Sequence, residues 1–307
     1  MQYTNWNAHL KGMRDFTNRP FIVISGFLAF NAILLLILFR YANEGSTQSA
    51  AFGPVIFEET SDFSHIRVRE TSGVRSLFFV DSEGREQRQS SIDINAPHQL
   101  QLGYTSTFFS TLLFRPKQER VLIVGLGGGG MVRFANHSLP QLQVDVVEID
   151  PVVVEVADQF FGTRNGPKTT IFTQDAFVYL KEPHGPYDVI YMDAFLRPRA
   201  DSELEEIPQR LKTAEFIREI TERLKPDGLV AFNLIEWEQT TPDDLAAIDS
   251  VFPAVYRFSV PGRGNLVVIG SMTGDMLSRD DLAKRAADLA DSGIDLPFAE
   301  FADSLRD

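Results

Sequence analysis

Residues 121–130 read VLIVGLGGGG, an apolar run that ends in glycines. Such a run predicts a buried strand of a parallel sheet, because both faces of these strands are covered and their residues need not alternate in polarity. Gly125, Gly127 and Gly130 form the spacing GxGxxG directly before a predicted helix. Glycines at this spacing permit a tight turn and let a ligand approach the backbone, so the stretch predicts a strand–helix unit with a ligand-binding loop.

The alternation of strands and helices continues toward the C-terminus. Strands that alternate with helices favour an α/β fold with a Rossmann-like, doubly wound parallel sheet. We assign this domain to residues 98–274 and predict a helical tail over residues 275–307. The further predicted strands lie in VDVVEID (144–150), TTIFTQD (169–175), YDVIYMDAF (187–195) and GLVAFNL (228–234).

The region before this domain predicts a second, smaller domain. Residues 52–97 contain three short runs rich in β-branched and aromatic residues, VIFEE, HIRVRE and VRSLFFV. Turn-forming residues separate the runs at 71–73 and 81–84. This pattern is typical of short antiparallel strands, so we expect a small β-rich domain here.

Residues 20–39 read PFIVISGFLAFNAILLLILF and are almost wholly apolar. As a helix this run is roughly 30 Å long, the thickness of a bilayer core, so it predicts a transmembrane helix over residues 20–40. More Lys and Arg precede the run than follow it, which places residues 1–19 in the cytoplasm and the C-terminal domain in the periplasm. A buried core helix and a cleaved signal peptide are the alternatives. Residues 41–51 are small and polar and predict a linker.

The composition limits the classes of partner. The net charge of the 307-residue chain is −13, which argues against nucleic acid, because phosphate binding needs a basic surface. The chain has no Cys, and its five His are scattered, so we predict no metal site. Phe is abundant, with 25 residues, and favours apolar cores or contact with lipid. The predicted partners are the lipid bilayer and an integral-membrane complex, reached through the transmembrane helix and Phe-rich surfaces.

Three acidic residues follow successive predicted strands. Glu148, Asp175 and Asp193 each stand at a strand end, on the side where open α/β sheets bind ligands. Glu148 has the position at which a carboxylate accepts hydrogen bonds from two ribose hydroxyls. Taken singly, each acid could equally be a helix N-cap or a solvated loop residue. Together with the glycine loop, the three predict one crevice for a nucleoside ligand.

The pattern resembles the spermidine synthase (aminopropyltransferase) family, within the S-adenosylmethionine-dependent methyltransferase fold. The resemblance covers about residues 55–272 and includes YTSTFF before the first Rossmann strand, VLIVGLGGGG, VVEID, TQDAFVYL and LKPDGLVAFNL. In detail it is closest to the bacterial branch that is often fused to membrane segments. The resemblance implies these roles: nucleoside binding by Gly125, Gly127 and Glu148, a hydrogen bond from adenine to Asp175, a general base at Asp193, and orientation of the attacking amine by Tyr104.

The chain departs from the family pattern on the amine side. The family loop GGGDGG reads GLGGGG here, so Gly128 replaces the acid that grips the aminopropyl ammonium. The second acid of the family motif DxxD is Leu196, with Arg197 and Arg199 close by, and Thr105 replaces a common glutamine. Charge-assisted hydrogen bonds contribute about 1.5–3 kcal/mol each, so losing two would weaken polyamine binding considerably.

These observations leave two main hypotheses about function. The first is a membrane-anchored transferase that uses decarboxylated S-adenosylmethionine, or S-adenosylmethionine itself, with Asp193 as the base and no metal. The second is a catalytically eroded synthase fold that serves as an accessory subunit of a membrane complex. A nicotinamide-dependent oxidoreductase is a third alternative, but it leaves the acids after the third and fourth strands unexplained.

Overall fold

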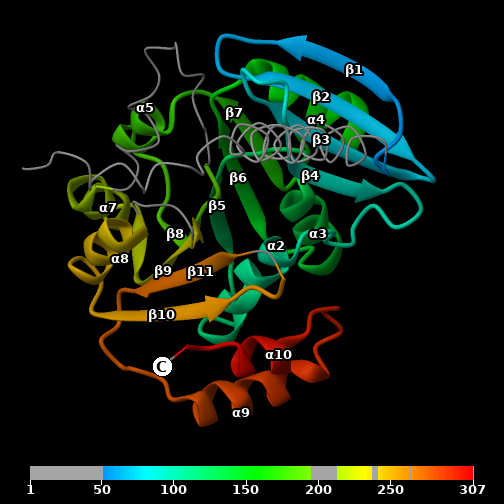
Figure 1. The fold of residues 1–307 in the computed structure, drawn as a ribbon. Helices are drawn as coiled ribbons and strands as arrows, with labels where there is room; N and C mark the ends of the chain where they lie inside the picture. Colours follow the sequence, from blue (N-terminus) through cyan, green and yellow to red (C-terminus); the bar gives the residue numbers. More distant parts are fainter. Residues whose placement is uncertain (1–50, 195–212, 237–240, 263, 307) are drawn as a thin grey trace, which may run out of the picture. The chain divides into compact units, whose positions relative to one another are not determined.

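Two β-sheets form the framework of the computed structural model, which describes residues 51–194, 213–236, 241–262 and 264–306. The smaller sheet has four antiparallel strands in the order β1-β2-β3-β4, drawn in blue to cyan in Figure 1. Its strands are β1 (Val55–Thr60), β2 (His65–Thr71), β3 (Val74–Val80) and β4 (Glu86–Asp93). The prediction of an antiparallel sheet before the Rossmann-like part is therefore confirmed.

The β2–β3 turn shows why this sequence forms a tight hairpin. Thr71 pairs with Val74, so the turn consists of Ser72 and Gly73 alone. Both residues have a positive φ, 51° and 80°. Two-residue hairpin turns of this kind match the twist of the strands that they join.

The larger sheet has seven strands in the order β10-β11-β9-β8-β5-β6-β7. Strands β5 to β9 run parallel to one another, and β11 is antiparallel to both of its neighbours, β9 and β10 (Figure 1). The strands are β5 (Arg120–Val124), β6 (Gln143–Glu148), β7 (Thr169–Thr173), β8 (Tyr187–Met192), β9 (Leu224–Ile235), β10 (Ala254–Ser259) and β11 (Asn265–Ser271). The predicted α/β, doubly wound architecture is confirmed.

Helices cover both faces of the seven-stranded sheet because its central strands are apolar on both sides. In β5, Val121 and Ile123 join the hydrophobic layer that includes α3, α4, α9 and α10. Leu122 and Val124 join the opposite layer, with α5, α7 and α8. The helical segments are α2 (Gly103–Phe108), η1 (Phe109–Leu113), α3 (Gly130–Ser138), α4 (Pro151–Phe161), α5 (Ala176–Lys181), α7 (Ala214–Thr221), α8 (Thr241–Asp249), α9 (Arg279–Ala290) and α10 (Phe298–Asp303).

The smaller sheet packs along α4. The ring of Phe57 in β1 lies 5.1 Å from the ring of Phe160, centroid to centroid. At the other end of α4, Ser61 and Ser64 of the β1–β2 turn both donate hydrogen bonds of 2.6 Å to Oδ2 of Asp150. The small sheet is therefore fixed to both ends of the helix that follows β6.

The structure bears on the predicted membrane localisation and on the predicted transmembrane helix in different ways. In the part of the chain that the structure describes, no helix has both the length and the apolar character needed to cross a bilayer. This finding corrects the predicted localisation as a single-pass membrane protein with a periplasmic domain. The segment 20–40, to which the prediction assigned the helix, lies outside the described residues, as do Leu196, Arg197 and Arg199.

The phenylalanines have a structural role in the described part of the chain. The large apolar side chains that are exposed there are Val55, Ile56, Ile94, Val178 and Met276, and none of them is a Phe. Phe108, Phe109, Phe161 and Phe258 are instead among the largest fully buried side chains. These four Phe residues supply core volume, while others, such as Phe57 and Phe160, are only partly buried.

Candidate active site

The glycine loop lies where the strand order of the large sheet reverses. β5 is followed by β6 on one side, while β8 pairs with the other side of β5. Ligands of open α/β sheets bind at such a switch point, at the carboxyl ends of the strands. The loop that follows β5, the end of β6 and the end of β8 therefore meet at one place.

Gly125 permits the close approach of two of these segments. Its φ is +97°, and a Cβ atom added to it would lie 2.6 Å from the carbonyl oxygen of Asp193. A side chain at this position would therefore collide with the chain that follows β8. Gly127 also has a positive φ, 53°, whereas Gly130 begins α3 with ordinary helical backbone.

Glu148 connects the end of β6 to the glycine loop. Its Oε2 accepts a hydrogen bond of 2.8 Å from the backbone N–H of Leu126, and Oε1 accepts one of 3.0 Å from Asp150. The side chain is buried, and burial raises the pKa of its carboxyl group. A carboxylate has about four acceptor positions, so each oxygen of Glu148 still has one for a hydroxyl of a ligand.

Asp193 follows β8 and is held by donors from two other elements. Tyr104 of α2 donates its hydroxyl to Oδ2 of Asp193 at 3.4 Å, and Asn233 of β9 donates its amide to Oδ1 at 3.2 Å. Burial raises the pKa of Asp193 to about 7, the two hydrogen bonds oppose this rise, and the charge of Glu148 adds to it. Asp193 and Glu148 thus lie near enough to interact electrostatically.

Tyr104 is suited to act as a hydrogen-bond donor and unsuited to act as a base. Burial and the neighbouring Asp193 raise the pKa of its hydroxyl well above the ordinary value. The phenol therefore keeps its proton over the physiological range. Its orientation is supported by the ring of Phe108, 6.0 Å away in an edge-on arrangement.

Asp175 has a well-defined local role. It is the N-cap residue of α5, and its Oδ1 accepts a hydrogen bond of 2.7 Å from the backbone N–H of Phe177. It follows β7, which is two strands from β5, so along this edge of the sheet it stands on the other side of β5 from Asp193. Capping and ligand binding are compatible, because a carboxylate has a second oxygen.

The back of the glycine loop is filled by other side chains. A Cβ atom on Gly128 would lie 2.8 Å from both the ring of Phe161 and Oγ of Ser90. Arg133 also braces the loop, donating hydrogen bonds to the carbonyl oxygen of Gly128 and, at 2.8 Å, to Oγ1 of Thr163. Burial lowers the pKa of Arg133 to about 10. The acid that the family pattern has at position 128 would therefore require the side chains of Phe161 and Ser90 to shift.

Sequence reasoning missed Asn233. The residue was included in the apolar run GLVAFNL, where it contributes the one strongly polar side chain. It is only 5% exposed. A buried amide needs hydrogen-bond partners, so an Asn inside an apolar strand was the signal that could have identified it.

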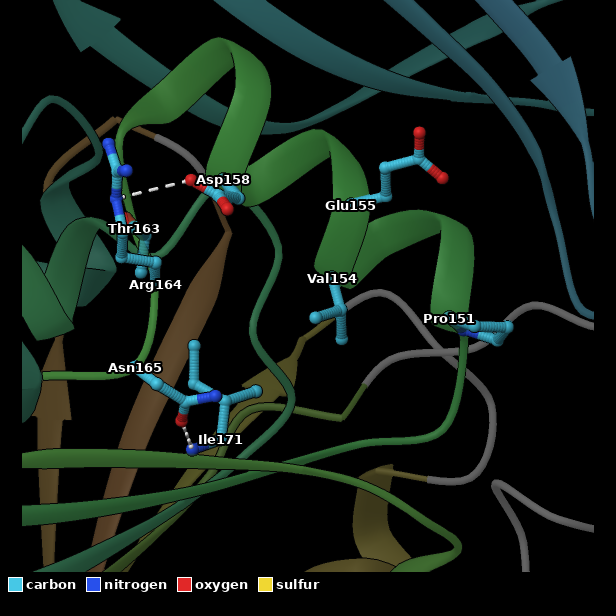
Figure 2. A pocket seen from close by; sticks show the side chains of 8 residues that line it. All are labelled: Pro151, Val154, Glu155, Asp158, Thr163, Arg164, Asn165 and Ile171. Carbon is cyan, nitrogen blue, oxygen red and sulfur yellow. Dashed lines mark hydrogen bonds and ion pairs between the residues drawn. The ribbon is translucent and has the colours of Figure 1, made fainter.

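A surface pocket between α4 and β7 lies apart from these residues (Figure 2). Its charged lining includes an ion pair of 3.2 Å between Asp158 and Arg164. Asn165 also lines it and accepts a hydrogen bond from the backbone N–H of Ile171. None of the predicted site residues contributes to this pocket.

The described residues contain no group of three or more His, Asp or Glu side chains placed to hold a metal ion. The arrangement at the strand ends is instead one of carboxylates, a phenol and an amide. Such groups can bind hydroxyls and cationic nitrogen and can accept a proton.

Comparisons with known proteins agree with this geometry. A family model described as "Spermine/spermidine synthase domain" matches residues 104–243. A polyamine aminopropyltransferase of Vibrio vulnificus is 31% identical over 239 residues, which cover 77% of this chain and 78% of the relative. One of Chromobacterium violaceum is 27% identical over 243 residues, which cover 78% of this chain and 89% of that one.

Solved structures show the same fold. A probable spermidine synthase from Corynebacterium glutamicum matches with a TM-score of 0.62 and 21% identity, over 79% of this chain and 88% of that chain. Human methyltransferase-like protein 13, solved in complex with SAH, matches with a TM-score of 0.51 and 26% identity, over 62% of this chain and 88% of that chain.

Proposed function

Because the chain belongs to the spermidine synthase (polyamine aminopropyltransferase) family, we propose that it transfers an aminopropyl group from decarboxylated S-adenosylmethionine to an amine. The observation that supports this proposal most directly is the environment of Asp193. Its side chain is partly buried, each of its carboxylate oxygens accepts one hydrogen bond, and its pKa is about 7. A general base works best when its pKa lies near the working pH.

Asp193 would remove one proton from the attacking ammonium group. The freed lone pair of the nitrogen then forms the new C–N bond while the C–S bond of the donor breaks, and the electron pair of that bond passes to sulfur. The sulfonium donor supplies an electrophilic carbon and a neutral leaving group, methylthioadenosine. Tyr104, which keeps its proton, would hold the carboxylate in place and orient the amine beside it.

Glu148 and the glycine loop would bind the nucleoside part of the donor. The remaining acceptor positions of Glu148 suit the two ribose hydroxyls, and Gly127 leaves the backbone open to a ligand. The second carboxylate oxygen of Asp175 would accept the adenine amino group. In this proposal the hydrogen bonds of Glu148 and Asp175 to the backbone are kept when the donor binds.

The packing at Gly128 favours a second candidate function. The acid that would bind the aminopropyl ammonium is absent here, and a Cβ at its position would lie 2.8 Å from both Phe161 and Ser90. A chain that has lost this contact could bind the nucleoside without efficient turnover. It would then be an accessory subunit that assembles with other proteins.

Formation of methylthioadenosine distinguishes the two candidates. The wild-type chain is incubated with decarboxylated S-adenosylmethionine and putrescine, and we expect methylthioadenosine to form at a rate at least about a hundredfold above that of Asp193→Asn. Asp158→Asn is the matched control, because it removes an exposed carboxylate at the surface pocket. Calorimetric binding of methylthioadenosine without any turnover would support the accessory role. Absence of both binding and turnover would overturn the assignment of the crevice.

A further inference from the structure

Two asparagines on neighbouring strands form a polar path to Asp193. Asn233 of β9 lies opposite Val267 of β11, so Asn265 is two residues along β11, on the same face of the sheet. The amide Nδ2 of Asn265 donates a hydrogen bond of 2.9 Å to Oδ1 of Asn233. Asn233 in turn donates from Nδ2 to Oδ1 of Asp193 at 3.2 Å.

The register of the sheet explains why Asn233 reaches Asp193. In the parallel pair of β8 and β9, Met192 lies opposite Phe232. The residue after Met192 is Asp193, and the residue after Phe232 is Asn233. The two side chains therefore lie next to each other. Asn265 is fixed as well, because it is the first residue of β11 and its carbonyl oxygen accepts the backbone N–H of Val260 at 3.3 Å.

The order of donors and acceptors along this path has a direction. An amide side chain has a donor end and an acceptor end, and by itself it can face a neighbour with either. Asn265 donates to the oxygen of Asn233, which leaves the NH2 group of Asn233 facing Asp193. The reversed amide would place its oxygen against the carboxylate oxygen of Asp193, where two acceptors repel each other unless the carboxyl group carries a proton.

We propose that Asn265 and Asn233 are positioning residues that hold the carboxylate of Asp193 in one orientation and stabilise its ionised form. This inference goes beyond the proposed function, which it uses only to give Asp193 its role as a base. The titratable groups that act on Asp193 from neighbouring described elements are Tyr104 of α2 and Glu148 of β6. Glu148 repels the negative charge of Asp193. The hydrogen-bonded pair Asn265–Asn233, which we call the asparagine relay, offsets this repulsion from the opposite side.

The ionisation of Asp193 can be followed without any turnover. The test uses the full chain with ¹³C-labelled aspartate and records the ¹³Cγ shifts against pH by NMR. The signal of Asp193 is identified by its loss in Asp193→Asn. We expect a midpoint near the value of about 7 for the wild type. In Asn233→Leu the midpoint should rise by about one pH unit, because the carboxylate loses a donor.

Asn265→Leu tests whether Asn265 acts on Asp193 through the orientation of the Asn233 amide, or only fills space beside it. It does not touch Asp193, yet it should raise the midpoint by about half a unit, because the amide of Asn233 is then free to reverse. In the double variant with Asn233→Leu, the change at position 265 should add nothing, since it acts through Asn233. The matched control is Asn136→Leu, which removes an exposed Asn bonded to Thr169 at 3.1 Å, and the midpoint should stay unchanged.

Two results would overturn the proposal: an unchanged midpoint in Asn265→Leu, or a full additive shift in the double variant. If Leu at position 265 impairs folding, as judged by circular dichroism, Asn265→Ala removes the same donor with less bulk and takes its place. Because the titration needs neither donor nor acceptor, it succeeds or fails independently of the turnover assay. If the protein shows the expected pKa shifts but no turnover, the proposal about the two asparagines stands and the proposed transferase function is refuted.

Discussion

Replacing Asp193 with Asn should make the protein more stable at neutral and alkaline pH while it abolishes turnover. The pKa of Asp193 is about 7 in the folded chain. In an unfolded chain an aspartate has a pKa near about 3.9. Between these two values the folded state keeps a proton that the unfolded state has released, so stability falls as the pH rises.

The magnitude follows from the difference between the two pKa values. About three units at about 1.36 kcal/mol each give a cost of up to about 4 kcal/mol above neutral pH. Below about pH 3, both states hold the proton and the cost vanishes. An Asn at this position carries no charge at any pH. Its oxygen can still accept from Asn233, and its NH2 group can donate to the hydroxyl oxygen of Tyr104.

Urea unfolding of the wild type and Asp193→Asn at several pH values measures this difference. We expect the free energy of unfolding of the variant to exceed that of the wild type by about 1–2 kcal/mol near pH 5 and by about 3–4 kcal/mol near pH 8. Asp62→Asn, at an exposed position in the β1–β2 turn, controls for the loss of one negative charge. A difference that does not grow with pH, or a variant less stable than the wild type at pH 8, would refute the argument.

Three further substitutions probe the remaining parts of the crevice. Tyr104→Phe removes a donor to Asp193, so the pH midpoint of the transfer rate should rise by about half a unit; an unshifted pH profile would mean that the hydroxyl does not act on the base. Glu148→Gln should weaken the binding of methylthioadenosine in calorimetry by about tenfold or more, because one hydrogen-bond acceptor becomes a donor; unchanged affinity would contradict the ribose contact. Gly128→Asp should lower the free energy of unfolding by about 1–3 kcal/mol, since its Cβ meets the ring of Phe161, and adding Phe161→Leu should recover part of this loss. Equal stability of Gly128→Asp and the wild type would show that the loop adjusts freely.

Much of the fold could be predicted because its signals are local. The apolar run before Gly125 and the alternation of strands and helices depend on neighbours in the sequence, and the structure has the strands where the runs are. The acids after the strands were predictable for the same reason, since the sheet brings its strand ends together. The structure places Glu148 and Asp193 near each other, and Asp175 on the other side of β5 from Asp193, as the cap of α5.

The roles of Asn233 and Asn265 could not be predicted, because they depend on pairing between distant strands. The register that puts Asn233 beside Asp193 involves residues 40 positions apart in the chain. Asn265 can donate to Asn233 only because the pairing of β11 with β10 and β9 places the two residues on neighbouring strands. The predicted membrane localisation had a different weakness, because apolar length and Lys and Arg counts are properties of one segment and are independent of the fold.

The replacement of the family acid by Gly128 involves more than one residue. In the sequence alone it is a single missing carboxylate, which suggests that restoring Asp is sufficient to restore amine binding. In the structure a Cβ at this position would meet the side chains of Phe161 from α4 and Ser90 from β4, so both side chains have to shift before an acid fits. Substitutions that share a packed site are not additive. We therefore expect Gly128→Asp alone not to restore amine binding, and restoration to need a compensating change at Phe161 or Ser90.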